Sequence, residues 1–288
     1  RGKQSKEFLS NLNVISKDIN FSNISLVSID LKNKIEVEKL ISDIKPYMIF
    51  HLSGPSSVYE SYKDPITTKE TIKSIFNNIT ESCINQKILP SFFNASSSET
   101  FSNDNFKPLN EKSKFNPRSP YAEAKYEIYR KTEELRNLYG WKIKSGIMFN
   151  HESQFRGENY LIMKIINQAI KIKSGNSNKL EIGSLSYIRD WSYAGDIADA
   201  IYRINTSNLA EDYVIGSGVG NTIKNLVEIV FSYFELDYKE FIVVNKSLLR
   251  NGDPISIVSD PSKISNELNW KTQIDFESLI DICIKFKL

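Results

Sequence analysis

The sequence predicts an α/β fold built on a doubly wound parallel sheet. Apolar segments of strand length alternate with segments of helical spacing in the first part of the chain. Residues 24–29 predict a strand, and Val37 to Ile44 predict a helix that stops at Lys45-Pro46. Residues 47–52 predict the next buried strand. Such an alternation is typical of parallel sheets that are covered by helices.

A further buried strand is predicted over Leu89 to Ala95, and it ends in the run Ser96-Ser97-Ser98-Glu99. Open α/β sheets bind their ligands at the carboxyl ends of strands. A serine cluster after a strand is, however, most often an ordinary turn whose hydroxyls satisfy the backbone. The run therefore indicates a site only if other residues support it.

The next helix is predicted from Pro120 to Leu138, with Ser119 as its N-cap and Gly140 at its end. Tyr121 and Lys125 lie four residues apart on one face of this helix, so the ammonium is expected to lower the pKa of the phenol. A Tyr/Lys pair alone more often covers a solvated helix face. The two later amphipathic helices predicted over 158–174 and 222–235 are interpreted as scaffold.

Composition excludes several classes of function. The 288 residues hold 37 Lys and Arg against 35 Asp and Glu, without a basic stripe interleaved with aromatics, so we expect no nucleic-acid partner. Cys83 and Cys283 are too few for a disulfide framework, which favours a reducing cytoplasm. With His51 and His151 they form no cluster of metal-site spacing, so no metal is expected. No apolar run approaches the roughly 20 residues that span a bilayer.

Longer segments carry a resemblance to a known family. The order strand, Ser-Ser-Ser-Glu, then Tyr-x-x-x-Lys resembles the extended short-chain dehydrogenase/reductases that act on nucleotide sugars. Gly146 to Gly157 reads GIMFNHESQFRG, which is similar to GILFNHESPRRG of the GDP-mannose 4,6-dehydratase family. Three further segments resemble that family: 183–196, Arg250 with 260–263, and 268–271. The resemblance covers nearly the whole chain and implies a Rossmann-like sheet with a smaller α/β substrate domain.

The resemblance implies a role for each matching residue. Ser97 takes the place of the family's active-site threonine, Glu99 that of its acid/base glutamate, and Tyr121 and Lys125 that of its redox pair. The implied cofactor-binding residues are Arg1, Asp30, Leu31, Leu52, Ser53, Gly54, Ser56, Tyr121, Lys125, His151 and Arg156. The implied substrate-binding residues are Ser98, Asn150, Arg189 and Arg250.

Physical chemistry agrees with some of these roles and leaves one open. The two substrate-side arginines are expected to hold the nucleotide diphosphate, because guanidinium forks bind phosphate oxygens in pairs. Small residues in the loop 53–57 let backbone come close to a ligand. Asp30, in contrast, is equally well explained as the cap of the next helix.

The implied reaction uses NADP or NAD without net consumption. Tyr121, as phenolate, removes the proton of the sugar 4-hydroxyl while hydride passes to the nicotinamide, and Ser97 hydrogen-bonds the same oxygen. Glu99 then removes the acidified proton at carbon 5 and helps to expel the 6-hydroxyl as water. The stored hydride returns to carbon 6.

The start of the sequence departs from this family. The family opens with a strand and a glycine-rich turn that receives the dinucleotide pyrophosphate on a helix N-terminus, whereas this sequence begins at Arg1-Gly-Lys-Gln. We therefore expect a truncated sequence or gene fragment that lacks the first strand and helix and binds cofactor weakly. Arg1 resembles a position that can face the adenosine phosphate of NADP. Gly216-Ser-Gly218-Val-Gly220 resembles a late strand-to-helix junction, and we do not interpret it as the phosphate loop.

The resemblance also implies an organisation and leaves alternatives open. Residues 1–150, with a return at about 189–212, are expected to form the dinucleotide-binding domain, and 151–288 the substrate domain of a homo-oligomer. The leading hypothesis is a 4,6-dehydratase acting on a GDP-linked mannose or heptose. The second is an epimerase, decarboxylase or 4-oxidase that uses the same Tyr/Lys pair, although the NHES element favours dehydration. The third is a noncatalytic sugar-nucleotide-binding protein.

Overall fold

The computed structural model describes residues 23–101, 107–249 and 253–288. Its main sheet has the strand order β1-β2-β3-β7. Every described pairing in this sheet is parallel, as predicted. The strands are β1 (Met48–His51), β2 (Ser91–Ser97), β3 (Ile143–Met148) and β7 (Tyr213–Ile215).

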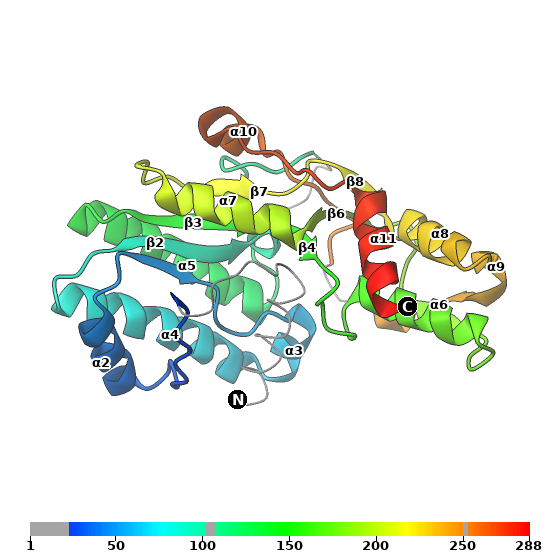
Figure 1. Ribbon diagram of the computed structural model, residues 1–288, viewed down its shortest axis with the longest axis horizontal. Coiled ribbons are helices and arrows are strands. Elements are labelled where there is room, and N and C mark those ends of the chain that lie inside the picture. Colours follow the sequence, from blue (N-terminus) through cyan, green and yellow to red (C-terminus); the bar gives the residue numbers. More distant parts are fainter. Residues whose placement is uncertain (1–22, 102–106, 250–252) are drawn as a thin grey trace.

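Helices cover both faces of this sheet, which confirms the doubly wound class (Figure 1). One face packs against α2 (Lys34–Ile44), α4 (Pro65–Asn85) and α5 (Pro120–Tyr139). The other packs against α7 (Ala194–Thr206) and α10 (Ser262–Leu268). The side chains alternate along β2 accordingly: Phe92 lies in the first core and Phe93 in the second, and both are fully buried.

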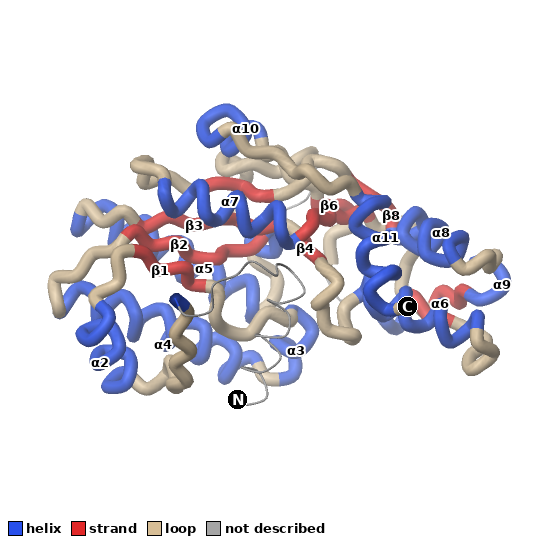
Figure 2. The backbone as a smooth tube through the Cα atoms, viewed as in Figure 1, coloured by secondary structure: helices blue, strands red, loops and turns tan. Residues whose placement is uncertain are grey.

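A second group of elements lies beside the main sheet (Figure 2). In its larger sheet, β6 pairs in parallel with β4 and β10 and antiparallel with β8. In its smaller sheet, β5 pairs in parallel with β9. The core is made by apolar faces of α6, α8 and α11. The elements are β4 (Asn150–Glu152), β5 (Leu180–Ile182), β6 (Ile188–Tyr193), β8 (Gly220–Thr222), β9 (Ile242–Val244), β10 (Ser256–Ile257), α6 (Leu161–Lys173), α8 (Ile223–Tyr233), α9 (Tyr238–Phe241) and α11 (Phe276–Lys287).

Three short helices complete the described structure. They are α3 (Val58–Lys63), η2 (Ser98–Thr100) and η3 (Lys246–Leu248). The first follows the loop after β1 and the second follows β2, so both stand at the carboxyl ends of parallel strands. This edge of the sheet is where α/β proteins bind ligands.

The strand predicted over residues 24–29 is wrong. The structure forms no strand there, and Leu26 and Val27 are 48% and 56% exposed. A strand exists only where a neighbour completes its hydrogen-bond ladder, and an apolar run of strand length cannot supply that neighbour. Among the described residues, the sheet ends at β1, where Phe50 is 41% exposed.

The glycine-dense loop between β7 and β8 is occupied by a carboxylate of the protein itself. Asp190 on β6 accepts hydrogen bonds from the backbone N–H groups of Ser217 (2.9 Å), Gly218 (3.0 Å) and Ser259 (3.1 Å). The hydroxyls of Ser217 and Ser259 also donate to it. The donors that a phosphate loop would offer are therefore already used, which agrees with the interpretation of this loop as a structural junction.

We expect Asp190→Asn to destabilise the fold by about 1–3 kcal/mol, because the amide group presents N–H where Asp190 now accepts from buried donors. Urea unfolding should show a lower midpoint with an unchanged slope. The matched control is Asp281→Asn on α11, whose carboxylate is 42% exposed in an ion pair with Lys285. An exposed pair of this kind contributes about 1 kcal/mol or less. Equal destabilisation by both variants would contradict the structural role of Asp190.

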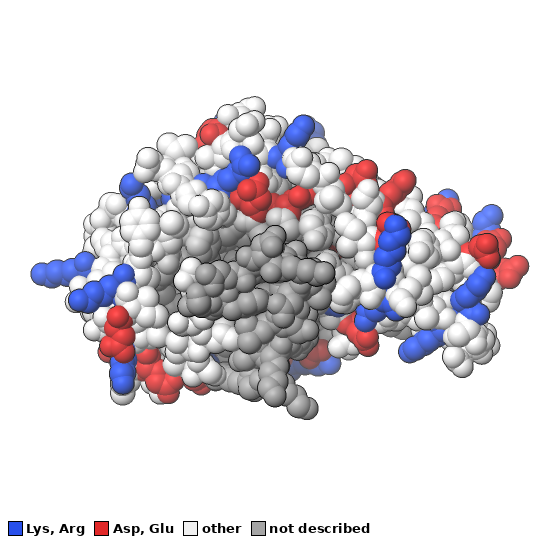
Figure 3. All heavy atoms as spheres, in the orientation of Figure 1, with Lys and Arg blue, Asp and Glu red and all other residues white. Residues whose placement is uncertain are grey.

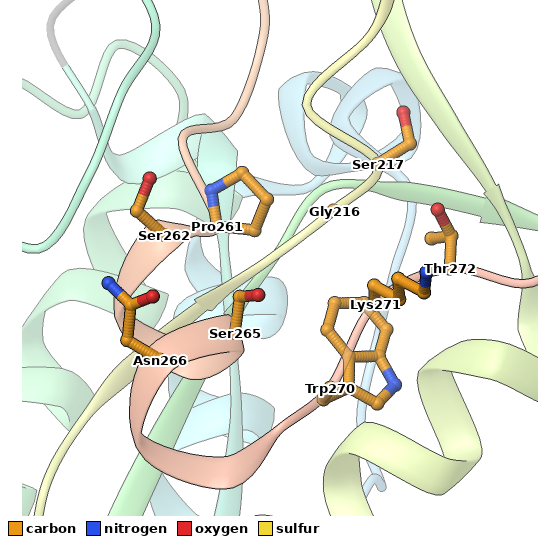
Figure 4. Close-up of a pocket in the computed structure, with 9 residues that line it drawn as sticks. All are labelled: Gly216, Ser217, Pro261, Ser262, Ser265, Asn266, Trp270, Lys271 and Thr272. Atoms are coloured by element: carbon orange, nitrogen blue, oxygen red, sulfur yellow. The ribbon is translucent and has the colours of Figure 1, made fainter.

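A pocket of about 280 Å³ lies beside this junction. Figure 4 shows its lining from the β7–β8 loop, α10 and the segment that follows α10. The lining residues are Gly216, Ser217, Pro261, Ser262, Ser265, Asn266, Trp270, Lys271 and Thr272. None of them was predicted to belong to the functional site.

Charged side chains of both signs are interspersed on the face shown in Figure 3. Many form exposed ion pairs, such as Lys34 with Glu81 and Lys173 with Glu235. Within the described ranges, no helix is long and apolar enough to cross a membrane. The same residues contain no group of three or more His, Cys, Asp or Glu side chains placed to hold a metal ion.

Candidate active site

The helix that carries the Tyr/Lys pair forms as predicted. The Ser119 hydroxyl accepts from the backbone N–H of Ala122 (3.1 Å), and Pro120 occupies the first turn. Gly140 ends the helix with φ of +59°, a left-handed conformation that favours glycine. Tyr121 and Lys125 lie on the buried face, at 8% and 7% exposure, rather than on a solvated one.

The serine run after β2 forms the facing part of the site. Ser97 ends the strand, and its hydroxyl caps the short helix η2 by accepting from the backbone N–H of Glu99 (3.3 Å). Ser98 is buried, whereas Ser97 and Glu99 are half-buried. The helix α5 packs against η2. The cap fixes this turn. Ser97 and Glu99 therefore lie beside the helix that carries Tyr121.

Ser97, Glu99 and Tyr121 lie together in one site. The Ser97 hydroxyl lies close enough to the Tyr121 phenol to lower its pKa, against the larger effect of burial. The Glu99 carboxylate lies close enough to the phenol to raise the same pKa. A hydroxyl from β2, a carboxylate from η2 and a phenol from α5 thus lie close together, an arrangement suited to proton transfer and to holding a changing oxygen.

The expected lowering of the Tyr121 pKa is wrong. Burial outweighs the favourable contacts and raises this pKa to about 12. Lys125 lies with Nζ 5.9 Å from the centre of the Tyr121 ring, and this ammonium donates to the carbonyl of Ala95 (2.9 Å). Burial lowers the pKa of Lys125 to about 8. Besides Ser97, the group that lowers the Tyr121 pKa is the guanidinium of Arg156.

The strand β4 and the segment after it bring further predicted residues to this region. Asn150 begins the strand and is half-buried. His151 follows, with Nδ1 3.0 Å from the carbonyl oxygen of Phe149, and burial lowers its pKa. The Arg156 guanidinium carbon lies 3.4 Å from the centre of the Tyr160 ring, and Nε lies 3.2 Å from Glu152 Oε2.

The loop after β1 is joined to the same region. Leu52, Gly54 and Ser56 are exposed and Ser53 is half-buried. Gly54 has φ of +122°, which leaves its backbone open to close approach. Ser56 Oγ lies within hydrogen-bond distance of Tyr160 Oη (3.2 Å). The contact joins residues 104 positions apart, so tertiary folding alone brings them together.

The remaining predicted residues lie in other surroundings. Asp30 does not cap α2, because Asn33 holds that place and Asp30 Oδ1 accepts from the backbone N–H of Lys32. Leu31 is half-buried and packs against the first core. Arg189 is buried, with Nη2 donating to Asp253 (3.0 Å). Arg1 and Arg250, both predicted to contact ligand, lie outside the described residues.

Sequence reasoning missed Glu152 and Tyr160. Glu152 belongs to the similar NHES segment, but the sequence assigned it no role. Its burial, at 6% exposure, could not be predicted from the pattern. Tyr160 stands just before α6, and no motif marks it. A buried charge is costly unless it is paired, so burial is the signal that would have identified Glu152.

The described residues fit a dinucleotide by their unused polar atoms, one donor and two acceptors. Glu152 Oε2, Gln154 Oε1 and Arg156 Nε are buried polar atoms without a hydrogen-bond partner in the described part of the chain. Such atoms are rare in native interiors and mark places where a polar ligand completes the bonding. The open backbone at Gly54 and the Lys125 ammonium lie on elements at the same edge of the sheet.

Comparisons with known proteins agree with this geometry. The family model of GDP-mannose 4,6 dehydratase matches residues 2–283. A GDP-mannose 4,6 dehydratase 2 of Arabidopsis thaliana is 30% identical over 271 residues, which are 93% of this chain and 72% of the relative.

Two solved structures show the same fold. RMD of Pseudomonas aeruginosa, complexed with NADPH, has a TM-score of 0.81 at 20% identity, over 90% of this chain and 87% of that one. UDP-glucose 4-epimerase of Thermotoga maritima, with UDP-glucose, has a TM-score of 0.82 at 22% identity, over 94% and 86%. The sequence match over almost the full chain decides the narrower relationship, and the chain belongs to the GDP-mannose 4,6 dehydratase family.

Proposed function

We propose that the protein is a nucleotide-sugar 4,6-dehydratase that converts GDP-mannose to the 4-keto-6-deoxy sugar. The observation that carries this proposal is that Tyr121, Ser97 and Glu99 share one site in a chain of this family. A redox step at carbon 4 needs a base for the 4-hydroxyl, and the elimination needs a second acid/base group beside carbon 5. The three side chains supply both functions.

In the first half of the reaction, Tyr121 removes the proton of the 4-hydroxyl. Ser97 donates to the same oxygen and stabilises it as it becomes a carbonyl. Arg156 favours the phenolate, and the Lys125 ammonium lies 5.9 Å from the centre of the phenol ring. In the second half, Glu99 takes the carbon 5 proton and returns a proton to the departing 6-hydroxyl, so that water leaves.

The residues proposed to hold NADP or NAD are the exposed loop Leu52 to Ser56, Tyr121 with Lys125, and His151 with Arg156. When bound, the nicotinamide accepts the hydride from carbon 4 and returns it to carbon 6. The protein contributes orientation, proton transfer and electrostatics. Burial lowers the pKa of His151, which disfavours its charged form.

On the substrate side, Ser98 and Asn150 are proposed to contact the sugar. Arg189 is proposed to hold the diphosphate, which requires its guanidinium to exchange the carboxylate of Asp253 for phosphate oxygens. The residues up to 150, with the return through α7, are proposed to form the dinucleotide-binding domain, and the remainder the substrate domain.

The test is incubation of the full-length protein with NADP and GDP-mannose labelled with deuterium at carbon 4. We expect a 4-keto sugar that has lost one water and carries the deuterium at carbon 6, as measured by mass spectrometry and NMR. UDP-mannose is the matched control for the nucleotide. A 4-epimer or a pentose as the product would overturn dehydration, while reaction with a different GDP-sugar would change only the assigned sugar.

A further inference from the structure

Glu152 is a buried carboxylate that the reaction itself does not use. It lies on β4 at 6% exposure, and its Oε2 lies 3.2 Å from Arg156 Nε. These two atoms form an ion pair but not a hydrogen bond of good geometry. A buried carboxylate of this kind is destabilising unless a cation stays beside it, so the pair fixes the position of Arg156 as much as that of Glu152.

Arg156 is held on a second side by an aromatic ring. Its guanidinium carbon lies 3.4 Å from the centre of the Tyr160 ring, a cation–π arrangement that arginine favours. Tyr160 in turn reaches Ser56 in the loop after β1 (3.2 Å between the hydroxyl oxygens). The chain of contacts therefore joins β4, the segment before α6 and the loop after β1.

The segment between Glu152 and Tyr160 is anchored by apolar packing as well. Phe155 meets Phe286 of α11 edge to face, with ring centres 5.4 Å apart. The family's GILFNHESPRRG has an arginine where this chain has Phe155. Arg156 is thus the one guanidinium that this described segment places beside the site.

We propose that Glu152 is a positioning residue, whose buried carboxylate holds the Arg156 guanidinium on the Tyr160 ring at the wall of the site that faces Tyr121. This role rests on the proposed function and adds to it the group that sets the charge around the base. Arg156 and Tyr160 both lie close enough to Tyr121 to act on its pKa: the guanidinium lowers it, and the Tyr160 phenol raises it. Without the Glu152 carboxylate, Arg156 would no longer be held beside Tyr121, and the Tyr121 pKa would rise further.

The Glu152 carboxylate that holds Arg156 has a shifted pKa of its own. Burial raises the pKa of Glu152 to about 7, against the opposing effect of Arg156. On its own segment the neighbouring titratable groups are His151 and Arg156. On α11 it is the Cys283 thiol, whose pKa of about 12 reflects burial first and the Glu152 charge second. Tyr193 is its register partner on β6, and Asp196 on α7 is bonded to the backbone of Gln273 and Ile274.

These groups determine the direction in which the effect of Glu152 changes with pH. Above pH about 7 the Glu152 carboxylate is charged and holds Arg156. Below that pH it takes up a proton and becomes close in shape and charge to glutamine. Wild type and Glu152→Gln should therefore behave alike at low pH and diverge as the pH rises.

The experiment measures kcat/KM for GDP-mannose and, separately, the Kd for NADPH by fluorescence titration. The full-length wild type and Glu152→Gln are compared from about pH 6 to about pH 8.5, a range that brackets the Glu152 titration. We expect the ratio of wild-type to variant kcat/KM to be near one at the acid end and to rise to about tenfold at the alkaline end. A tenfold ratio corresponds to a change of one unit in the Tyr121 pKa. The control is Glu228→Gln on α8, an exposed pair with Lys224, for which the ratio should stay flat.

A double-mutant cycle shows whether the effect passes through the arginine. On an Arg156→Met background, Glu152→Gln should change neither kcat/KM nor the NADPH affinity further. If Glu152→Gln does not fold, as judged by urea unfolding, the ratio of wild type to Arg156→Met should show the same rise through pH about 7.

Two outcomes would overturn the role of Glu152. One is a ratio that is independent of pH, which indicates a merely structural residue. The other is an undiminished effect on the Arg156→Met background. If the wild type binds NADPH but does not convert GDP-mannose, the proposed function fails, and the pH dependence of NADPH affinity still tests the anchor.

Discussion

Tyr121→Phe is expected to lower kcat for GDP-mannose by about 10²–10⁴-fold, the range typical for loss of a positioned general base. The ring of phenylalanine fills the same buried space, so KM and the urea midpoint should change little. Because the pKa of Tyr121 is raised to about 12, the phenolate is scarce at neutral pH. Wild-type kcat/KM should therefore increase as the pH rises, and the variant should lose this increase.

The matched control is Tyr126→Phe on the same helix. The Tyr126 ring packs on Phe115 with centres 5.0 Å apart. Its loss of a hydroxyl should leave the rate and the pH profile as in wild type. A Tyr121→Phe variant that retains wild-type turnover would remove Tyr121 from the reaction and with it the proposed mechanism.

Glu99→Gln is expected to lower the rate of formation of the dehydrated product by a similar factor of about 10²–10⁴. The first redox step should be spared. Since the Glu99 carboxylate raises the Tyr121 pKa, its removal favours the phenolate. A single turnover should then accumulate reduced cofactor, observed by its fluorescence, together with the 4-keto sugar that retains its 6-hydroxyl. Exchange of the carbon 5 proton with deuterated water should be lost.

Glu133→Gln on α5 serves as the comparison, because its carboxylate is 45% exposed in a pair with Arg130. It should form product at the wild-type rate. If Glu99→Gln instead slows the appearance of reduced cofactor as strongly as Tyr121→Phe does, Glu99 acts in the oxidation and not in the elimination.

The local pattern of the sequence was sufficient for the elements that carry these two residues. Ser119 as N-cap, Pro120 in the first turn and Gly140 at the end predicted α5 within a residue, because capping depends on neighbours in the chain. The apolar run into three serines predicted β2 and its polar end. The similar segments carried the family, which the comparison confirms.

The local sequence pattern was not sufficient where contacts with distant parts of the chain decide the structure. Residues 24–29 form an apolar run of strand length, yet a strand also needs a neighbour, and such a run does not provide one. Arg189 pairs with Asp253, 64 residues away, a contact that its motif does not show; its role in holding phosphate stays a prediction. Asp190 fills the glycine loop through contacts that span 27 and 28 residues and also accepts from Ser259, 69 residues away.

By itself, the sequence determined the doubly wound class, the family, and the residues that meet at the end of β2, since these follow from short-range patterns. Tertiary structure alone decided the electrostatics of the site. Burial of α5 against the sheet raises the Tyr121 pKa instead of lowering it, and burial of Glu152 raises its pKa to about 7 against the opposing effect of Arg156. The cost of removing a charge from water depends on every element packed around it, and no local pattern encodes that sum.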